Sequence, residues 1–301
     1  VVLFLHFIQI GNAQKLSEYS EISVITCAPG NELYSTFGHT AVRVKDPVYR
    51  FDKVYNYGTF NFETPNFYLK FTKGQLDYML SVTHYKYFVA SYMEENRWIK
   101  EQLLELTPTQ KQDVYEFLEE NALPENKYYR YDFFFDNCAT RVKDVLKEVL
   151  GDDLIIPQSI TEEGTTFRDI LQPYLVGKEW ERLGINLALG QPADVEASPD
   201  EATFIPDFTE LYFDKCLVKR NGEEIPFVKV KRMLYEPENE IEESNTFITP
   251  SRLFWLIFVL FFLLTFLEFK KNVYYVIADK ALYFFFGFAG FIILFMWFGT
   301  D

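Results

Sequence analysis

Two long apolar runs near the carboxyl end constrain the fold of this chain more than any other feature. Residues Leu253 to Phe269 are apolar except for Thr265 and Glu268, and residues Ala281 to Phe298 contain no charge. Each run approaches the ~20 residues that an α-helix needs to cross a bilayer core. Two adjacent runs of this kind predict a transmembrane helical hairpin within residues 251–301.

The charges beside these runs predict the orientation of the hairpin. Lys270, Lys271 and Lys280 lie between the runs, whereas the segment before the first run is rich in glutamate. Positively charged loops stay in the cytoplasm, so the large amino-terminal part of the chain is expected on the periplasmic side of the inner membrane. The second run ends on that same side at Asp301, so we expect the protein to continue beyond this residue.

The amino end of the chain indicates export. Residues 1–14 begin with an apolar stretch, and Gly11 and Ala13 occupy the small-residue positions that precede a signal-peptidase cleavage site at Gln14. We interpret this segment as the remnant of a signal peptide, with a short buried strand as the alternative. No cysteine follows the cleavage position, so the protein is not expected to be a lipoprotein itself.

One histidine and one cysteine stand in sequence contexts that favour catalysis. His39 opens an alternating stretch typical of a strand, whereas Cys138 follows two N-cap residues, Asp136 and Asn137, at the start of an amphipathic helix. A thiol in the first turn of a helix has a lowered pKa, and a nearby imidazole can exchange protons with it. This pattern predicts a cysteine nucleophile with a histidine base. The alternatives are a small core cysteine and a structural histidine.

A third residue of the predicted site is expected on the next strand. The stretch from Lys53 to Phe62 reads as a strand that returns antiparallel to the one after His39, because a turn at Asp46 separates them. Asn56 would then lie beside His39 and orient its ring, with Tyr57 as the second choice. An Asn56 side chain bound only to local backbone is the alternative.

The region outside the membrane is expected to form one large domain with an appendage. We assign residues 15–190 to an α+β catalytic domain with an antiparallel sheet and residues 191–236 to a loop and a β-hairpin. Residues 237–250 are assigned to an acidic linker. The hairpin is predicted from Leu211–Val218 and Ile225–Met233, which flank an Asn-Gly turn.

The helix that begins at Cys138 is expected to be amphipathic. Val142 and Val145 fall on the face of the thiol at helical spacing, which points that face toward the sheet that carries His39. Lys143, Lys147 and Glu148 are expected to face away into solvent.

Composition excludes several classes of function. The net charge is −15, and no basic stripe is present, so a nucleic acid is not an expected partner. No Cys/His spacing suits zinc and no glycine-rich phosphate loop occurs, so neither a metal nor a cofactor is expected. Cys27 and Cys216 remain beside Cys138, either as a disulfide or as two buried thiols.

The order of these motifs resembles a known fold. A histidine on a strand followed by Asn137-Cys138 at a helix start resembles the circularly permuted papain-like (NlpC-like) thiol fold, which includes relatives of lecithin:retinol acyltransferase. More narrowly, Phe37–Val44, Tyr55–Phe60 and Tyr131–Arg141, with membrane spans behind them, resemble the Lnb-type bacterial lipoprotein N-acyltransferase family. The resemblance covers roughly residues 20–301.

The resemblance implies an acyltransferase of the cytoplasmic membrane. Cys138 would take an acyl chain from a phospholipid donor and pass it to the amine of a diacylated lipoprotein acceptor, with His39 as the base. We further expect backbone N–H groups at the helix start to hold the oxyanion. For the Asn137 side chain, a contribution to this oxyanion site and an N-cap role are equal alternatives. Arg43 or Arg141 is expected to bind the lipid phosphate, unless it is paired structurally.

The aromatic residues near the thiol lead to a further expectation. If the substrates are lipids, an apolar groove should open from Cys138 toward the side where Leu253 enters the membrane. Rings from Phe133 to Phe135 and from Phe67 to Phe71 are expected to line it.

Two rival functions remain open from the sequence. Papain-like domains of the envelope also include cysteine peptidases and amidases that cut peptidoglycan. The second rival is a membrane-tethered binding domain that has no catalytic activity. The two spans and the lack of a recognisable wall-binding module weigh against the peptidase.

Overall fold

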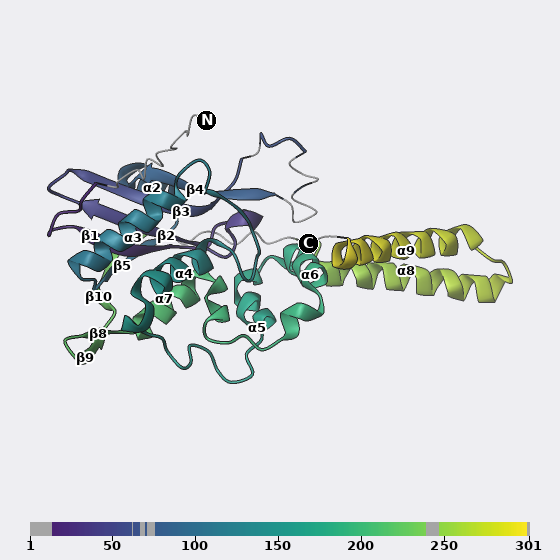
Figure 1. The fold of residues 1–301 in the computed structure, drawn as a ribbon. Helices are drawn as coiled ribbons and strands as arrows, with labels where there is room; N and C mark the ends of the chain where they lie inside the picture. Colours follow the sequence, from purple (N-terminus) through teal and green to yellow (C-terminus); the bar gives the residue numbers. More distant parts are fainter. Residues whose placement is uncertain (1–13, 62, 67–69, 71–75, 239–246, 300–301) are drawn as a thin grey trace, which may run out of the picture.

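The computed structural model describes residues 14–61, 63–66, 70, 76–238 and 247–299, which form an α/β body and a long helical hairpin that extends away from it (Figure 1). The body contains a seven-stranded sheet in the order β10-β5-β1-β2-β3-β4-β6, and every neighbouring pair in it is antiparallel. Its strands are β1 (Glu21–Cys27), β2 (His39–Asp46), β3 (Phe51–Thr59), β4 (Asp77–His84), β5 (Ile99–Leu104), β6 (Tyr128–Arg130) and β10 (Val228–Tyr235). The predicted α+β class with an antiparallel sheet is confirmed.

Both faces of the central strands are covered, so the buried side chains of one strand belong to two different cores. Side chains alternate between the two faces of a strand. On one face, Val42 and Val44 of β2 join the large core that includes the helices α3 (Pro108–Asn121), α4 (Cys138–Leu150) and α7 (Pro206–Lys215). On the other face, Ala41 packs with Phe88 of helix α2 (Tyr85–Glu94) in a smaller core. The central strands are therefore buried between helices on both faces.

Two shorter helices follow α4 and lead toward the membrane hairpin. They are α5 (Phe167–Leu171) and α6 (Glu179–Leu189), and the 3₁₀ segment η3 (Gln172–Leu175) connects them. A further 3₁₀ turn, η5 (Glu201–Phe204), precedes α7 and packs against α4. This packing overturns the expectation that Lys143 faces solvent: Lys143 is buried beneath η5, whereas Glu148 is exposed as expected.

The predicted β-hairpin has the expected turn but different strands. Asn221 and Gly222 both have positive φ and join β8 (Leu217–Arg220) to β9 (Glu223–Pro226), which form a second sheet with β7 (Leu154–Ile155). The predicted strand from Leu211 is wrong, because Pro206 starts helix α7 and this helix continues to Lys215. Residues after Phe227 leave the hairpin and join the large sheet as β10.

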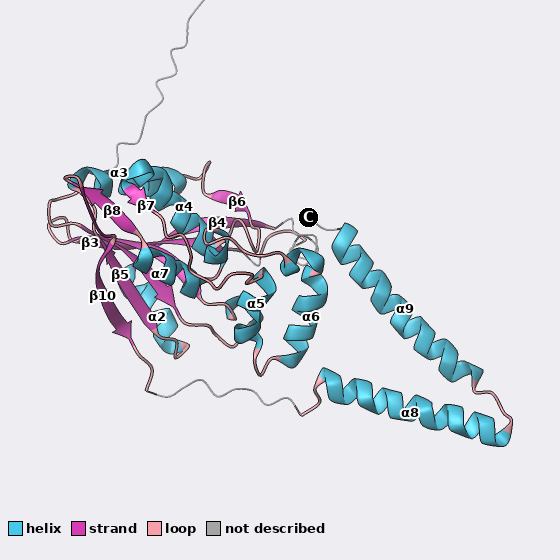
Figure 2. Cartoon of the chain, turned by 90° about the horizontal axis from the view of Figure 1, so that it is seen from below, coloured by secondary structure: helices cyan, strands magenta, loops and turns pink. Residues whose placement is uncertain are grey.

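The two apolar runs form helices α8 (Pro250–Lys271) and α9 (Val276–Phe298), and both are long and apolar enough to cross a membrane. Among their residues only Pro250 is buried, so the apolar side chains face outward along the hairpin. At 1.5 Å per residue, each helix is roughly 33 Å long, which matches a bilayer core. Figure 2 shows that α8 starts near one end of α6 and that α9 ends near the other end.

Candidate active site

Cys138 is the first residue of α4, and the preceding residue caps this helix. The Asn137 side-chain oxygen accepts hydrogen bonds from the backbone N–H groups of Ala139 (2.8 Å) and Thr140 (3.0 Å). Its amide nitrogen donates to the carbonyl oxygens of Phe133 and Phe204, both at 2.8 Å. These bonds use both N–H groups of the amide, so the geometry favours the N-cap role of Asn137 over that of an oxyanion donor.

His39, Asn56 and Cys138 meet at one end of the large sheet. The register of β2 and β3 pairs Val42 with Tyr55, so the alternation places His39 and Asn56 on the same face. The Nε2 atom of His39 is hydrogen-bonded to the side-chain oxygen of Asn56, while the ring also forms a hydrogen bond with Cys138. Because Asn56 accepts from Nε2, the Nδ1 atom is the ring nitrogen that is left for the thiol.

The charges of this pair shift both of its pKa values. Burial acts to raise the pKa of the Cys138 thiol, but the charge and hydrogen bond of His39 and the backbone N–H groups of Thr40 and Cys138 outweigh it, so this pKa is lowered. Burial acts to lower the pKa of His39, but the charge and hydrogen bond of Cys138 and the hydrogen bond of Asn56 outweigh it, so this pKa is raised. The two shifts favour a thiolate–imidazolium pair, which is the reactive form of a cysteine nucleophile.

Gly58 leaves an open space where the reactive groups converge. Its φ is +88°, and a Cβ atom at this position would lie 3.3 Å from Cys138 Cβ, 3.9 Å from His39 Cε1 and 4.0 Å from the Tyr129 hydroxyl. A side chain at residue 58 would therefore crowd both members of the pair. A glycine inside a strand often marks such a close approach, so Gly58 is a sequence signal for this part of the site.

Tyr129 is a site residue that the sequence did not indicate. It lies on β6, is buried, and its hydroxyl finds no acceptor for its proton among the residues that the structure describes. Burial raises the pKa of this phenol, so it keeps its proton at neutral pH. The guanidinium of Arg141 lies 3.7 Å from the centre of its ring. Tyr129 is thus a buried donor beside the thiol.

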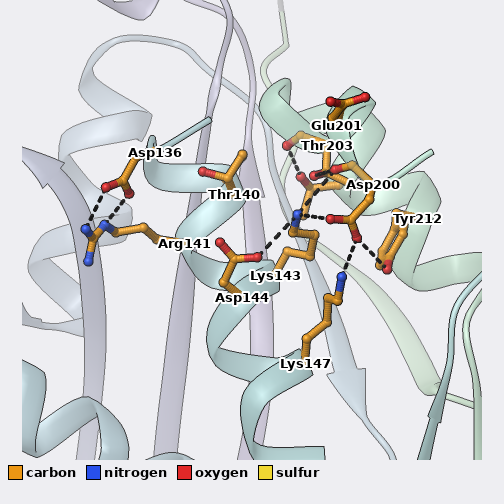
Figure 3. A network of polar contacts seen from close by, with 12 residues as sticks. Asp136, Thr140, Arg141, Lys143, Asp144, Lys147, Asp200, Glu201, Thr203 and Tyr212 are labelled. Carbon is orange, nitrogen blue, oxygen red and sulfur yellow. Dashed lines mark hydrogen bonds and ion pairs between the residues drawn. The ribbon is translucent and has the colours of Figure 1, made fainter. Parts of the chain in front are cut away.

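The two arginines considered for phosphate binding are engaged in ion pairs. Arg43 is buried on β2, where it binds Asp52 (2.6 Å) and Glu101 (2.8 Å). Arg141 binds both carboxylate oxygens of Asp136, at 2.5 and 2.7 Å (Figure 3). These contacts favour the structural alternative for both residues.

A second ion-pair cluster holds the middle of α4 against η5 (Figure 3). Asp200 accepts hydrogen bonds at 2.7 Å from the ammonium groups of Lys143 and Lys147 and one at 3.2 Å from the Tyr212 hydroxyl. The same segment supplies the Phe204 carbonyl that binds Asn137. The cluster therefore fixes the loop that supports the start of α4.

An apolar cavity of about 480 Å³ opens beside Cys138. Its lining includes the reactive residues His39 and Cys138, the glycine Gly58, aromatic side chains and one face of α6. Of the expected rings, Phe133 lines it, Phe134 is buried in the core and Phe135 is exposed. Phe67 to Phe71 lies outside the described residues except for Lys70. The cavity has the size of a small-ligand pocket.

The remaining sequence candidates lie outside this cavity. Tyr57 is buried, and its ring packs edge-on against Tyr129. Cys27 and Cys216 are both free and buried, so the disulfide alternative is wrong. Burial raises the pKa of Cys27 well above the usual range and that of Cys216 to about 12. Cys138 is thus the thiol prepared for reaction.

Comparison with known proteins identifies the family. The Lnb N-terminal periplasmic domain matches residues 12–171, more than half of the chain, and the Lnb transmembrane domain matches residues 242–301. No match was found among curated proteins or among solved structures. The chain belongs to the Lnb family, as an inner-membrane protein with a periplasmic domain and carboxyl-terminal membrane helices.

Proposed function

We propose that this protein is an apolipoprotein N-acyltransferase. It moves an acyl chain from a phospholipid, through a thioester on Cys138, to the amine of the diacylglyceryl-cysteine at the start of a lipoprotein. The observation that carries the proposal is a thiol with a lowered pKa, bound to His39, facing an apolar cavity in a membrane-anchored domain. We also assign this domain to the circularly permuted papain-like fold, because His39 precedes Cys138 and the latter starts the central helix.

In the first half of the reaction, the Cys138 thiolate attacks the carbonyl carbon of a phospholipid ester. The tetrahedral intermediate expels the glycerol oxygen, which takes the proton of the His39 imidazolium. The products are an acyl-thioester and a lysophospholipid. Gly58 leaves room for the carbonyl between the thiol and Tyr129.

The oxyanion of this intermediate needs hydrogen-bond donors that are already in place. The backbone N–H groups of Thr40 and Cys138, which stabilise the thiolate, supply two of them. The Tyr129 hydroxyl is the third, because it keeps its proton and has no acceptor of its own among the described residues. We therefore give the side-chain donor role to Tyr129 in place of Asn137.

In the second half, the α-amine of the lipoprotein attacks the thioester carbonyl. His39 accepts a proton from this amine, and Cys138 leaves as the thiolate. An amide forms, the thioester breaks, and the enzyme returns to its starting state. An apolar cavity favours lipid chains over the polar peptides that a wall peptidase cuts.

The test follows the acyl group. The protein in phospholipid vesicles is expected to carry an acyl adduct on Cys138 by mass spectrometry, and a diacylated lipoprotein peptide should remove it and gain one chain on its amine. Cys138→Ser should abolish turnover and leave folding nearly intact, while His39→Ala should cost at least ~10²-fold. Wild-type turnover of Cys138→Ser would exclude the thioester. Cleavage of peptidoglycan fragments without any acyl adduct would instead support the peptidase.

A further inference from the structure

Helix α6 stands between the cavity and the membrane helices. Its residues Ile185, Ala188 and Leu189 line the cavity, at the spacing of a single helix face. Other apolar side chains of the same segment point outward: Leu187 and Trp180 are exposed, and so is Val176 just before the helix. The helix is therefore apolar toward the cavity, and its exposed side combines these apolar side chains with the charged Glu181 and Arg182 near its start.

Both membrane helices are fastened to α6. The Trp180 indole donates a hydrogen bond of 2.7 Å to the carbonyl of Ile248, two residues before α8 begins. The Trp297 indole, in the last turns of α9, donates one of 2.8 Å to the carbonyl of Leu187. Figure 2 shows α6 lying between the start of α8 and the end of α9.

These contacts fix where α6 lies relative to the bilayer. The start of α8 and the end of α9 are the ends of two helices that each match a bilayer core of about 30 Å. Both ends lie at the outer, periplasmic interface, since the domain beside them is periplasmic. Indole rings prefer this interface, and Trp180 and Trp297 occupy it here. The outer face of α6 is thus presented to lipid.

We propose that the Cys138 cavity has a lateral opening to the outer leaflet of the inner membrane, between α6 and the turn at Leu33 and Tyr34. This deepens the proposed function, on which it rests, by naming the route of the acyl chains. The turn lines the cavity, and both of its apolar side chains are more than half exposed. A lipid chain passing between α6 and this turn stays in contact with apolar surface from the bilayer to the thiol. The partner is lipid hydrocarbon, because the cavity lining offers little charge to a polar ligand.

The experiment compares three maleimides on the protein in phosphatidylethanolamine–phosphatidylglycerol vesicles: a small one, one with a dodecyl chain, and one with a water-soluble chain of equal length. Cys27 and Cys216 are buried, so labelling reports Cys138. We expect the dodecyl reagent to react at least tenfold faster than the water-soluble one. Equal rates for the two long reagents would mean that the cavity opens to water and would overturn the proposal.

A matched pair of variants on α6 locates the opening. Ala188→Trp should slow the dodecyl reagent at least tenfold relative to the small one, because residue 188 lines the cavity. Gly184→Trp should change this ratio less than twofold, because a side chain at residue 184 extends into open space. Ala188→Leu should lower the same labelling ratio and, because leucine is smaller than tryptophan, should perturb folding less. An unchanged ratio in both Ala188 variants, or an equal fall in Gly184→Trp, would overturn the opening at α6.

Labelling with maleimides needs no acyl transfer. The lateral opening and the acyltransferase activity are therefore tested by independent measurements. If the labelling results exclude the opening, an acyl adduct on Cys138 would still support the acyltransferase, and the lipid would have to reach the thiol by another route. Absence of the adduct, with labelling as expected, refutes the acyltransferase and leaves the opening as a lipid-binding site.

Discussion

The side chain of Asn56 binds the Nε2 atom of His39 across two neighbouring strands, on the face of the sheet that both residues share. This bond selects the tautomer that leaves Nδ1 free for Cys138, and it holds the ring in place. Asn56 is thus a positioning residue that acts through His39.

Asn56→Ala should therefore lower turnover by about 10- to 100-fold, less than the ~10²- to 10⁴-fold that general acid–base catalysis contributes, because His39 itself remains. The pH profile of turnover should shift as well, because the hydrogen bond of Asn56 helps to raise the pKa of His39. Steady-state acyl transfer between pH 5 and 9 measures both effects. Asn126→Ala is the control, since the Asn126 side chain donates to the backbone carbonyl of Glu120 at the end of α3. A loss of activity without a shift of the profile would point to a folding defect.

The reactivity of the thiol should extend to acidic pH. A free cysteine has a pKa of about 8.5, whereas the pKa of Cys138 is lowered chiefly by His39. Alkylation of Cys138 by iodoacetamide should thus continue at pH values too low for an ordinary cysteine thiol to react. In His39→Ala the midpoint of the rate profile should move upward by at least one pH unit. An unchanged midpoint would show that His39 does not stabilise the thiolate.

Tyr129→Phe removes one hydroxyl and tests the oxyanion donor. Loss of such a donor typically costs about 10²- to 10³-fold in kcat. The KM and the rate of thiol alkylation should stay within twofold, because neither depends on the oxyanion. Tyr115→Phe is the control, a buried tyrosine of α3 away from the thiol. Equal losses in kcat and in alkylation would assign Tyr129 to the support of Cys138.

The predictable and unpredictable parts of this site differ in their physical origin. Cys138 and Asn137 were found because an N-cap is a local pattern. Asn56 was found because consecutive strands usually pair, which β2 and β3 do. Tyr129 could not be predicted, because it reaches the site only through the pairing of β6 with β4, and no local sequence pattern predicts this pairing.

The same distinction applies to the fold as a whole. The membrane helices and the turn at Gly222 follow from composition and turn chemistry. The buried state of Lys143 depends on η5, which arrives from a distant part of the chain and supplies Asp200. The wall that α6 contributes to the cavity has the same long-range origin.

Asp200→Asn should destabilise the periplasmic domain. It leaves the Lys143 ammonium, whose side chain is only 6% exposed, without its main charge partner. We expect a loss of ~2 kcal/mol, less than for a fully buried pair because Asp200 is partly exposed. Asp144→Asn is the control, because its carboxylate also contacts Lys143 (3.3 Å) but is 59% exposed, and should cost under ~0.5 kcal/mol.

The destabilisation caused by Asp200→Asn should depend on pH, and the pKa shift of Asp200 gives the direction. Burial acts to raise the pKa of Asp200, but the two lysines outweigh it, so the pKa in the folded state is lowered. Its contribution to the free energy of unfolding is therefore present above the unfolded value of about 3.9 and is lost as the pH falls through the folded value. Unfolding curves at pH 7 should separate wild type from Asp200→Asn, and the curves should converge below about pH 4. A constant difference across this range would exclude the carboxylate charge as its cause.

The contact between Gly190 and Trp297 gives the last prediction, on the joint between α6 and α9. A Cβ atom at Gly190 would lie 3.0 Å from the Nε1 atom of Trp297, so Gly190→Ala should push the indole from the carbonyl of Leu187. We expect the ratio of dodecyl to small maleimide labelling of Cys138 to fall at least threefold, because the wall of the lateral opening loses its anchor.

Gly151→Ala is the matched control for backbone strain. Gly151 also ends a helix, with φ 51° and ψ −128° against 58° and −150° at Gly190, so alanine is disfavoured at both positions. A Cβ at Gly151 meets no atom within 4 Å, whereas one at Gly190 meets the Trp297 ring. Both variants should lose similar stability through their backbones, but only Gly190→Ala should change the labelling ratio. An equal change in both would mean that general strain, and not the contact with α9, controls access to the thiol.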